Sequence, residues 1–311
     1  MESSRIKVSV ICNAYNHEKY IRKCLESLVM QRTTFDYEIL VHDDASPDKT
    51  ADIIREFEQK YPDLIKPIYQ TENQHSKGIA SRFQFPRVRG EYVAICEGDD
   101  FWTDELKLQK QFDALEAHPE IDMCAHSSTK VAEDGEKILE YISPRKENCI
   151  IPVEDVILGG GGFVATNSLM YRTCLIRGNE PEFRKYWRID YTLQIFGSLR
   201  GGMLYLPEVM SAYRWLSVGS WTSKLLKDKS KRKFTYEHKT KMLQLFNEDT
   251  DYKYAKTVEK AILDAEYLYY YSNGPYKTAL QKKYKEIRKA KGIKQLIKLY
   301  IKVLFPFCFK K

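Results

Sequence analysis

The sequence predicts an α/β fold in which a mostly parallel central sheet carries helices on both faces, followed by a helical extension at the C-terminus. Two observations support this class. Over the first ~115 residues, runs of β-branched and aliphatic residues alternate with stretches whose apolar residues recur at helical spacing. Beyond about residue 222 the helical spacing continues without strand-like runs. Strands that alternate with helices form βαβ units, which place the strands in parallel.

Four strands are predicted for this sheet, at 6–12, 37–41, 64–70 and 92–96. Apolar residues three or four positions apart follow three of these strands and mark one helix face each: Ile21, Cys24, Leu25 and Leu28; Ile53, Ile54, Phe57 and Tyr61; Leu108, Phe112 and Leu115. The stretch 77–88 also has a helical pattern, and we expect Pro86 to kink or end that helix.

Beyond Met123 the regular alternation of strand and helix patterns ends. The next segment is typical of a hairpin that turns at Asp134-Gly135. A glycine run at 159–162 follows, and its spacing matches no phosphate-binding motif. A further strand, a helix ended by glycine and an extended stretch are then predicted at 163–172, 186–202 and 203–215. We expect an α/β domain at 1–221 and a basic helical extension at 222–311.

The amino-acid composition indicates what kind of partner the protein binds and in which compartment it folds. The chain has 311 residues, 43% hydrophobic content and a net charge of +7, which suits a sizeable core and an acidic partner. Its seven cysteines are scattered and form no CxxC pair, which argues against a disulfide framework or a structural zinc site and favours a reducing compartment. We expect no signal peptide and no membrane span.

Polar clusters follow three of the predicted strands at their carboxyl ends. They are Asn13-Ala14-Tyr15-Asn16, Asp43-Asp44 and Glu97-Gly98-Asp99-Asp100. Because ligands bind parallel sheets beyond the carboxyl ends of the strands, these clusters should meet at one edge of the sheet. This convergence is the strongest inference that the residues allow without any comparison.

Three carboxylates within four residues repel one another, so Glu97, Asp99 and Asp100 need a cation or many donors. Mg²⁺ or Mn²⁺ prefers such oxygen ligands and leaves positions open for phosphate oxygens. The alternative is a solvated acidic turn in which Asp100 caps the next helix. For a nucleotide, Tyr15 offers a stacking surface and Asp44 an acceptor, although Tyr15 would equally suit a core position. No P-loop, GxGxxG or nucleic-acid-binding motif is present.

Four segments carry a resemblance to a known family: "VSVICNAYNHEKYIRKCLESLVMQ", "YEILVHDDASPDKT", "GEYVAICEGDDFWTDELKLQKQ" and "IDYTL…YLPEVMSAYRW". In order and spacing they resemble a family 2 glycosyltransferase of the Rossmann-like GT-A fold, of the bacterial capsule, exopolysaccharide or lipopolysaccharide type. The resemblance covers roughly residues 5–221. It implies a nucleotide-sugar-binding half at 1–122 and an acceptor-binding half at 123–221.

The resemblance also implies roles for individual residues. The nucleotide sugar would be bound by Ala14, Tyr15, Asn16, Asp44, Arg82, Glu97 and Asp99. Asp99 and Asp100 would hold Mn²⁺ or Mg²⁺, which neutralises the leaving diphosphate. Asp190 would be the general base of an inverting, metal-dependent transfer, its alternative role being a carboxylate that stabilises a helix N-terminus. The acceptor would contact Thr166, Asn167, Trp215 and Trp221, although the two tryptophans would equally suit core packing.

Two positions depart from the family pattern. Glu97 stands where the family's acidic motif usually begins with Asp. Leu216 stands where many relatives carry a histidine, so a metal would depend on carboxylates, phosphates and water. Neither departure removes the essential acids. Two alternatives to a transferase remain: a nucleotidyltransferase, which lacks its Gly-rich basic loop here, and a catalytically silent nucleotide-sugar-binding subunit of a polysaccharide assembly complex.

The C-terminal segment suggests where the protein works. Ile293, Leu296, Ile297, Tyr300 and Leu304 share one helical face, and Lys294, Lys298 and Lys302 lie on another. A basic amphipathic helix suits an anionic bilayer, whereas the commoner fate of such a face is packing on the domain. We expect a cytoplasmic protein that contacts the inner face of the cell membrane and serves a glycan or lipid-linked glycan acceptor.

Overall fold

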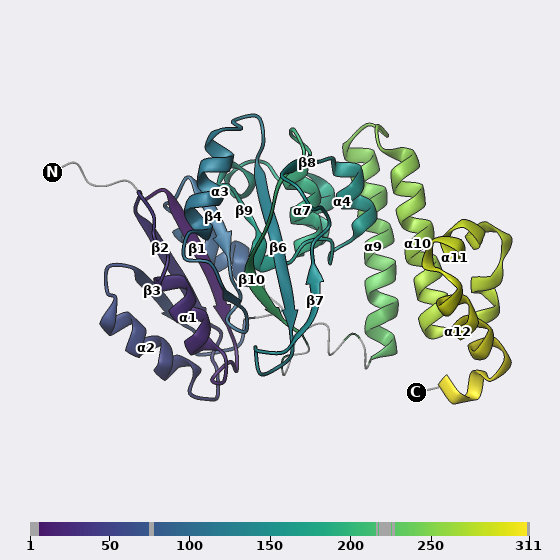
Figure 1. The fold of residues 1–311 in the computed structure, drawn as a ribbon, viewed down its shortest axis with the longest axis horizontal. Helices are drawn as coiled ribbons and strands as arrows, with labels where there is room; N and C mark the ends of the chain where they lie inside the picture. Colours follow the sequence, from purple (N-terminus) through teal and green to yellow (C-terminus); the bar gives the residue numbers. More distant parts are fainter. Residues whose placement is uncertain (1–5, 75–77, 216, 218–224, 226–227, 310–311) are drawn as a thin grey trace. The chain divides into compact units, whose positions relative to one another are not determined.

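The computed structural model describes residues 6–74, 78–215, 217, 225 and 228–309 (Figure 1). The chain forms two compact units. The first comprises Met1–Glu180 and Arg188–Gly219, and the second comprises Pro181–Trp187 and Ser220–Lys311. The domain division at residue 221 stays a prediction, and the compact units differ from it in the placement of Pro181–Trp187.

The first unit is built on one sheet, which has ten strands within the described residues (Figure 1). Its order is β3-β2-β1-β4-β9-β6-β10-β5, with β7 paired to β6 and β8 paired to β10. The strands are β1 (Val8–Ala14), β2 (Tyr37–Asp43), β3 (Ile65–Tyr69), β4 (Tyr92–Ile95), β5 (Phe101–Trp102), β6 (Met123–Val131), β7 (Ile138–Ile142), β8 (Cys149–Ile151), β9 (Met170–Arg172) and β10 (Met203–Arg214).

Pairing in this sheet confirms the predicted α/β class. The strands β3, β2, β1 and β4 pair in parallel, and so do β6 and β10. The shorter strands β5, β7, β8 and β9 pair antiparallel with their neighbours. The predicted hairpin is the β6–β7 pair, and Gly135 supplies the positive φ of 75° that its turn requires.

Helices of the first unit follow the strands: α1 (Ile21–Val29), α2 (Thr50–Lys60), α3 (Lys107–Glu116), α4 (Val153–Gly159), α5 (Cys174–Arg177) and α7 (Asp190–Ser198). The predicted face of α1 is confirmed, because all four of its apolar residues are fully buried in the core cluster with β1, β2 and β4. In the described part of the predicted helical stretch, Ala80–Gln84 form a short π-helix and Phe85–Arg87 a 3-10 turn that contains Pro86. Thr166–Ser168 forms another 3-10 turn.

Four of the seven cysteines lie in the core of the first unit. Among the described residues all are free thiols, and Cys12, Cys24, Cys96 and Cys124 are buried as small core side chains. Cys149 is half-buried, and Cys174 and Cys308 are exposed.

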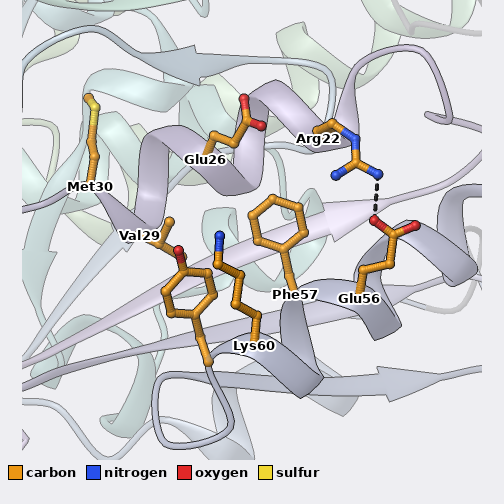
Figure 2. Close-up of a pocket in the computed structure, with 8 residues that line it drawn as sticks. Arg22, Glu26, Val29, Met30, Glu56, Phe57 and Lys60 are labelled. Carbon is orange, nitrogen blue, oxygen red and sulfur yellow. Dashed lines mark hydrogen bonds and ion pairs between the residues drawn. The ribbon is translucent and has the colours of Figure 1, made fainter.

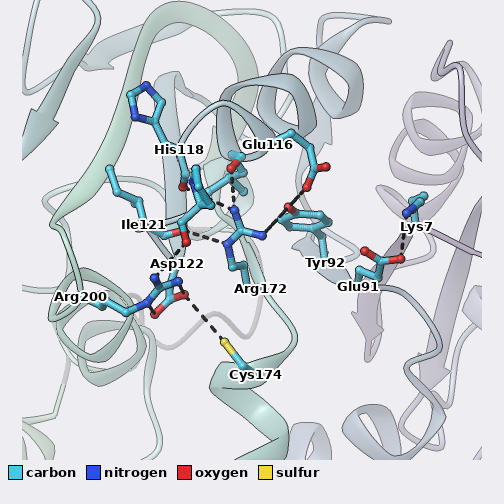
Figure 3. Close-up of polar contacts among 12 residues, drawn as sticks. Lys7, Glu91, Tyr92, Glu116, His118, Ile121, Asp122, Arg172, Cys174 and Arg200 are labelled. Carbon is cyan, nitrogen blue, oxygen red and sulfur yellow. Dashed lines mark hydrogen bonds and ion pairs between the residues drawn. The ribbon is translucent and has the colours of Figure 1, made fainter.

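A polar network clamps the sheet at the start of β4 and β6, opposite the carboxyl ends of the parallel strands (Figure 3). The Arg172 guanidinium donates to the Ile121 carbonyl at 2.9 Å, the Leu115 carbonyl at 2.6 Å and the Tyr92 hydroxyl at 2.6 Å. Arg200 pairs with the Asp122 carboxylate beside it. These charges are satisfied within the protein, so we assign them to stability and not to a reaction.

The second unit is helical. Its described helices are α6 (Glu182–Tyr186), α9 (Lys229–Asp249), α10 (Ala255–Asn273), α11 (Lys285–Lys291) and α12 (Ile293–Leu304), with 3-10 turns at Tyr276–Leu280, Lys282–Tyr284 and Pro306–Phe309. Phe183 of α6 packs edge-on against Phe246 of α9, with ring centroids 5.2 Å apart. Within the described parts of both units, none of the helices combines the length and hydrophobicity that a membrane crossing requires.

A buried lysine gives the stability of the first unit a pH dependence. Lys107 is fully buried on α3, where its Nζ donates to Gln111 Oε1 at 2.7 Å and lies 4.0 Å from the centre of the Trp102 ring. Burial lowers the pKa of Lys107 to about 7. Because the unfolded chain holds this proton up to a pH of about 10, the free energy of unfolding should rise with pH above about 7.

We therefore expect Lys107→Met to remove this slope. Between pH 6.5 and 8.5 the wild type should gain about 1–2 kcal/mol of unfolding free energy relative to the variant. Urea unfolding of both proteins at the two pH values measures the difference. Parallel pH profiles would show that Lys107 keeps its charge in the folded protein.

Candidate active site

The polar clusters meet at the carboxyl ends of β1, β2 and β4, as the sequence predicts. β1 lies between β2 and β4 in the sheet, so the segments that follow these strands are neighbours. The Gly98 N–H donates to the Asn13 carbonyl at 2.9 Å, and the Asp44 N–H donates to the Ala14 carbonyl at 2.9 Å. Backbone hydrogen bonds thus join the acidic turn to the last residues of β1, and these residues to Asp44.

Within the acidic turn, Asp100 points into the protein. It is almost fully buried, and its Oδ1 accepts a hydrogen bond from the Arg214 backbone N–H at 2.8 Å. Its Oδ2 accepts from Asn167 Nδ2 at 3.0 Å. Burial, with the charge of Asp99 second, raises the pKa of Asp100 well above its usual range. The geometry supports a role for Asp100 in fixing the turn, and its predicted contact with a metal stays a prediction.

Glu97 and Asp99 are less buried than Asp100. Asp99 Oδ2 accepts from Ser217 Oγ at 2.5 Å, and Glu97 Oε1 accepts from Asn13 Nδ2 at 3.4 Å. Burial of its carboxyl group, followed by the charges of Asp190 and Asp99, raises the pKa of Glu97 to about 8. This concentration of negative charge would be relieved by a cation.

The donor set of this turn fits a hard divalent cation that other ligands complete. Carboxylate oxygens of Glu97 and Asp99 are the ligand type that Mg²⁺ and Mn²⁺ prefer. Among the described residues, however, no three His, Cys, Asp or Glu side chains converge into a metal site. Any metal here would therefore need phosphate oxygens or water as its remaining ligands.

Arg214 supports the acidic turn, and nothing in the sequence alone pointed to this role. It ends β10 and is almost fully buried, and its Nε donates to the Asp99 carbonyl at 2.8 Å. Its guanidinium lies 4.7 Å from the centre of the Tyr20 ring and 5.6 Å from that of Phe101. Arg214 thus holds the acidic turn from behind, through both its backbone and its side chain.

The residues predicted to bind a nucleotide base lie after β1 and β2. Ala14 is buried, whereas the Tyr15 side chain is 46% exposed and presents a ring to solvent. Asp44 is buried, and its Oδ1 accepts from the Gln74 N–H at 2.7 Å. Its Oδ2 is buried as well and has no hydrogen-bond partner among the described residues. A buried carboxylate oxygen without a donor is costly, and a ligand N–H would satisfy it.

The segment after β1 is locked onto the segment after β2 by a row of hydrogen bonds. Asn16 adopts a positive φ of 59°, which turns three successive backbone N–H groups toward side-chain oxygens. These N–H groups, of Asn16, His17 and Glu18, donate to Ser46 Oγ at 3.0 Å, Thr50 Oγ1 at 2.8 Å and Asp48 Oδ2 at 3.0 Å. Asp43 also lies at this loop, where its Oδ2 accepts from the Ser46 N–H at 3.3 Å.

Gly98 is the point where the acidic turn approaches the loop after β1 most closely. A Cβ at this position would lie 2.8 Å from His17 Nδ1 and 3.1 Å from the Asn13 carbonyl oxygen. We expect Gly98→Ala to displace the turn and lower the unfolding free energy by about 1–3 kcal/mol. Thermal unfolding measures the loss, and nucleotide binding measures the displacement.

A matched control is Gly162→Ala, because a Cβ there meets no atom within 4 Å. This control should leave stability and binding close to those of the wild type. If Gly98→Ala matched Gly162→Ala in stability and in nucleotide binding, the acidic turn would have space for a Cβ at position 98, and Gly98 would not be needed for its position.

Asp190 lies at the start of α7 and its side chain is exposed. Its Oδ2 accepts a hydrogen bond from Thr166 Oγ1 at 2.6 Å, which fixes the orientation of the carboxylate. The charge of Asp190 contributes to the raised pKa of Glu97, so the two carboxylates lie in the same electrostatic environment. Thr166, predicted to contact the acceptor, is therefore a direct neighbour of the predicted base.

Asn167 lies beneath this surface. Its side chain is fully buried, where Nδ2 donates to Asp100 Oδ2 and to the Ala212 carbonyl, and Oδ1 accepts from Ser211 Oγ. These contacts use the whole amide, so the geometry supports a positioning role for Asn167 and gives no support for direct contact with an acceptor.

The remaining predicted site residues are less constrained. Arg82 is exposed, and its guanidinium lies 5.4 Å from the centre of the Phe83 ring. Trp215 is half-buried, with Lys130 Nζ 4.3 Å from its ring centre. Trp221 and Leu216 lie outside the described residues. The roles of Arg82 and Trp215 stay predictions.

A pocket also lies between α1 and α2, where Arg22 and Glu56 form an ion pair of 2.6 Å (Figure 2). Its other lining residues include Met30, Phe57 and Lys60. None of the predicted site residues lines it, so we do not assign the reaction to this pocket.

Comparison with protein families gives a match to the model of glycosyl transferase family 2 over residues 9–170. The uncharacterized protein Rv1520 of Mycobacterium tuberculosis is 38% identical over 220 residues, which are 70% of this chain and 61% of that protein. The putative teichuronic acid biosynthesis glycosyltransferase TuaG of Bacillus subtilis is 33% identical over 138 residues, 43% of this chain and 52% of TuaG. The chain thus spans less than two thirds of the length of these relatives.

Two solved structures share the fold. Residues 1–349 of S. aureus TarS in complex with UDP-GlcNAc superpose with a TM-score of 0.54 at 18% identity, covering 88% of this chain and 82% of that one. The mannosyltransferase PcManGT from Pyrobaculum calidifontis, in complex with GDP-Man and Mn²⁺, gives a TM-score of 0.55 at 17% identity, covering 98% of this chain and 88% of PcManGT. At these identities the likeness concerns the fold alone.

Proposed function

Since the chain belongs to glycosyl transferase family 2, we propose that it transfers a sugar from a nucleotide sugar, UDP-linked, to a hydroxyl of a glycan or lipid-linked glycan acceptor. We place this activity in cell-surface polysaccharide synthesis, a setting that the name of TuaG supports. The observation that carries the proposal is the position of Glu97 and Asp99 just after the carboxyl end of β4, beside that of β1, with the charge of Asp190 close enough to raise the pKa of Glu97.

The donor base would lie against the segments that follow β1 and β2. The exposed Tyr15 ring offers it a stacking surface, and the unpartnered Asp44 Oδ2 accepts from a base N–H. Ala14 and Asn16 shape the loop, which the hydrogen bond from the Asn16 N–H to Ser46 Oγ helps to hold in place. UDP is supported by the complexes of TarS with UDP and UDP-GlcNAc, and GDP by that of PcManGT.

The donor diphosphate would lie over the acidic turn. Asp99, with Glu97 beside it, would hold a Mn²⁺ or Mg²⁺ ion, and Asp100 is the further ligand that the sequence predicts. When bound, such an ion neutralises the negative charge that develops on the leaving diphosphate. Arg82 would add a positive charge near the diphosphate. Arg214 and Asn167 keep the turn in position from below.

Asp190 would act as the general base. The acceptor hydroxyl attacks the anomeric carbon as its proton passes to a carboxylate oxygen of Asp190, and the nucleotide diphosphate leaves from the opposite face of the sugar, which inverts the anomeric centre. Thr166 holds Asp190 Oδ2 by a hydrogen bond of 2.6 Å, so we assign the proton to Oδ1, which accepts no hydrogen bond from the described residues. Thr166, Trp215 and Trp221 would contact the acceptor.

Binding measurements test this assignment. Titration calorimetry with UDP, GDP, CDP and their common sugars, with and without Mn²⁺, should detect one nucleotide class whose binding the metal strengthens. Asp99→Asn should weaken that metal-dependent binding at least tenfold, because it removes a carboxylate that would hold the metal.

The matched control is Asp63→Asn, an exposed aspartate that precedes β3 at the other end of the sheet. It should bind like the wild type. If no nucleotide binds to well-folded protein, the acidic turn has a structural role and the transferase proposal loses its physical support. Donor binding without transfer to any acceptor would instead favour a catalytically silent binding subunit.

A further inference from the structure

The helix α12 of the second unit has three distinct sides. One side is buried and contains Leu299, with the partly buried Val303 beside it. A second side is basic and carries Lys294, Lys298 and Lys302 at spacings of four residues. The third is apolar and exposed, and consists of Ile293, Ile297, Tyr300, Ile301 and Leu304. At 3.6 residues per turn these three sets occupy separate sectors of the helix.

The buried side is the one that packs α12 on its own unit. Leu299 packs in a cluster with Tyr267, Tyr276 and Tyr284, and Val303 adds to it. Lys302 Nζ donates to the Tyr271 carbonyl at 2.8 Å and lies 4.0 Å from the centre of that ring. The apolar face that the sequence predicted for α12 is therefore mostly exposed to solvent. Leu299 and Val303, which lie on another side of the helix, attach α12 to its unit.

The exposed side is large for surface apolar residues. Ile293 is 68% exposed and Leu304 is 70% exposed, and beyond the helix Phe305 and Phe307 are 58% and 79% exposed. Apolar side chains scattered singly on a surface are ordinary, but a continuous strip of this kind marks an interaction site. Water contact with such a strip is unfavourable by roughly 25 cal/mol for each Å².

The charge around this strip indicates what covers it. From Lys277 to Lys302 the chain has ten Lys or Arg residues and a single acid, Glu286. Lys294 and Lys298 flank the strip and have no ion-pair partner within the described part of the chain. A second copy of this surface would bring like charges together, whereas an acidic surface would pair with them.

We propose that the apolar strip of α12, with Phe305 and Phe307, docks in the interfacial layer of an anionic lipid bilayer. A helix of twelve residues is about 18 Å long, which suits an orientation in the plane of the membrane. The apolar side chains enter the boundary between headgroups and acyl chains, and Lys294 and Lys298 bind the anionic headgroups beside it. The inference does not depend on the proposed transferase activity.

Flotation of the full chain with lipid vesicles tests the proposal. Vesicles of phosphatidylcholine with 30% phosphatidylglycerol are compared with phosphatidylcholine alone, at roughly 50 and 300 mM salt. We expect binding to the anionic vesicles that weakens in high salt. Lys294→Gln/Lys298→Gln should lower the partition coefficient on the order of 25-fold, about five-fold for each lysine. Ile297→Gln/Leu304→Gln should lower it at least as much.

Matched controls separate this surface from general effects. Ile138→Gln/Tyr141→Gln replaces two exposed apolar residues of β7, and Lys256→Gln/Lys260→Gln replaces two lysines of α10; both should bind like the wild type. Nucleotide binding of the α12 variants should be unchanged, which shows that they are folded and keeps this test apart from that of the donor site. Equal binding of α12 variants and wild type would overturn the proposal, as would concentration-dependent self-association that these variants abolish.

Discussion

Asp190→Asn is expected to lower sugar transfer by about 10²–10⁴-fold while donor binding stays within about twofold of the wild type. The amide keeps the size of the carboxylate and can still accept the hydrogen bond from Thr166 Oγ1, but it cannot take the proton of the acceptor hydroxyl. Removing the negative charge beside Glu97 should not harm the fold, because Asp190 is exposed. Transfer is followed by release of the nucleoside diphosphate, and donor binding by calorimetry.

The control for this experiment is Asp52→Asn. Asp52 is also an exposed aspartate in the first turn of a helix, α2, and pairs with Arg55 at the surface. It makes the same chemical change and affects a helix N-terminus to the same degree, so it should leave transfer unaltered. An Asp190→Asn protein that retains most of its transfer would remove Asp190 from the mechanism and leave the donor site intact.

Arg214→Ala is expected to lower the free energy of unfolding by about 3–5 kcal/mol and to abolish donor binding. The substitution removes the Nε–H bond to the Asp99 carbonyl and the bond to the Glu133 carbonyl, and it empties the space between Tyr20 and Phe101. Asp99 and Glu97 then lose the support that keeps them facing the donor. Urea unfolding and calorimetric titration measure the two effects.

Two further variants show which property of Arg214 matters. Arg214→Lys keeps the charge and most of the volume but cannot reproduce the planar set of donors, so it should recover stability more than it recovers donor binding. Arg55→Ala is the control, because Arg55 also lies over an aromatic ring, that of Tyr69 at 4.7 Å, but is exposed. It should change stability by less than about 1 kcal/mol. If Arg214→Ala bound the donor as tightly as the wild type, the acidic turn would keep its position without Arg214.

Much of the fold could be predicted because its signals are local. The β-branched runs, the helix face at Ile21 and Leu28 and the Asp134-Gly135 turn are each fixed within a few residues. Together with the resemblance they led to the GT-A class, which the structural neighbours confirm. The meeting of the clusters after β1, β2 and β4 followed from parallel pairing, which places carboxyl ends at one edge.

The residues beneath the site could not be predicted, because their partners are distant in sequence. Arg214 follows an ordinary extended stretch, and nothing local distinguishes it from a surface arginine. The buried contacts of Asn167 could not be predicted either, since a buried amide and an exposed one look alike in a sequence. Which carboxylate of the acidic turn faces inward is decided by Arg214 and Asn167 together, so Asp99 and Asp100 could not be told apart.

The faces of α12 illustrate a different difficulty. Apolar residues cover more than half of its circumference, so periodicity alone could not decide which strip packs against the protein. Leu299 and the tyrosine cluster decide it, and those tyrosines belong to α10 and to the turns that follow it. The prediction that Lys294, Lys298 and Lys302 share a separate side of α12 is confirmed, because residues four positions apart always lie on one side of a helix.

The order of the strands along the chain has a consequence for folding during synthesis on the ribosome. Asp100 leaves the ribosome 114 residues before Arg214, whose backbone N–H holds it, and β5 finds its partner only when β10 has been made. Until then the acidic turn lacks the support of Arg214, and the proposed donor site is incomplete. A nascent or clipped chain that lacks β10 would therefore not complete this proposed site, so synthesis of the last strand of the sheet sets when the site can form.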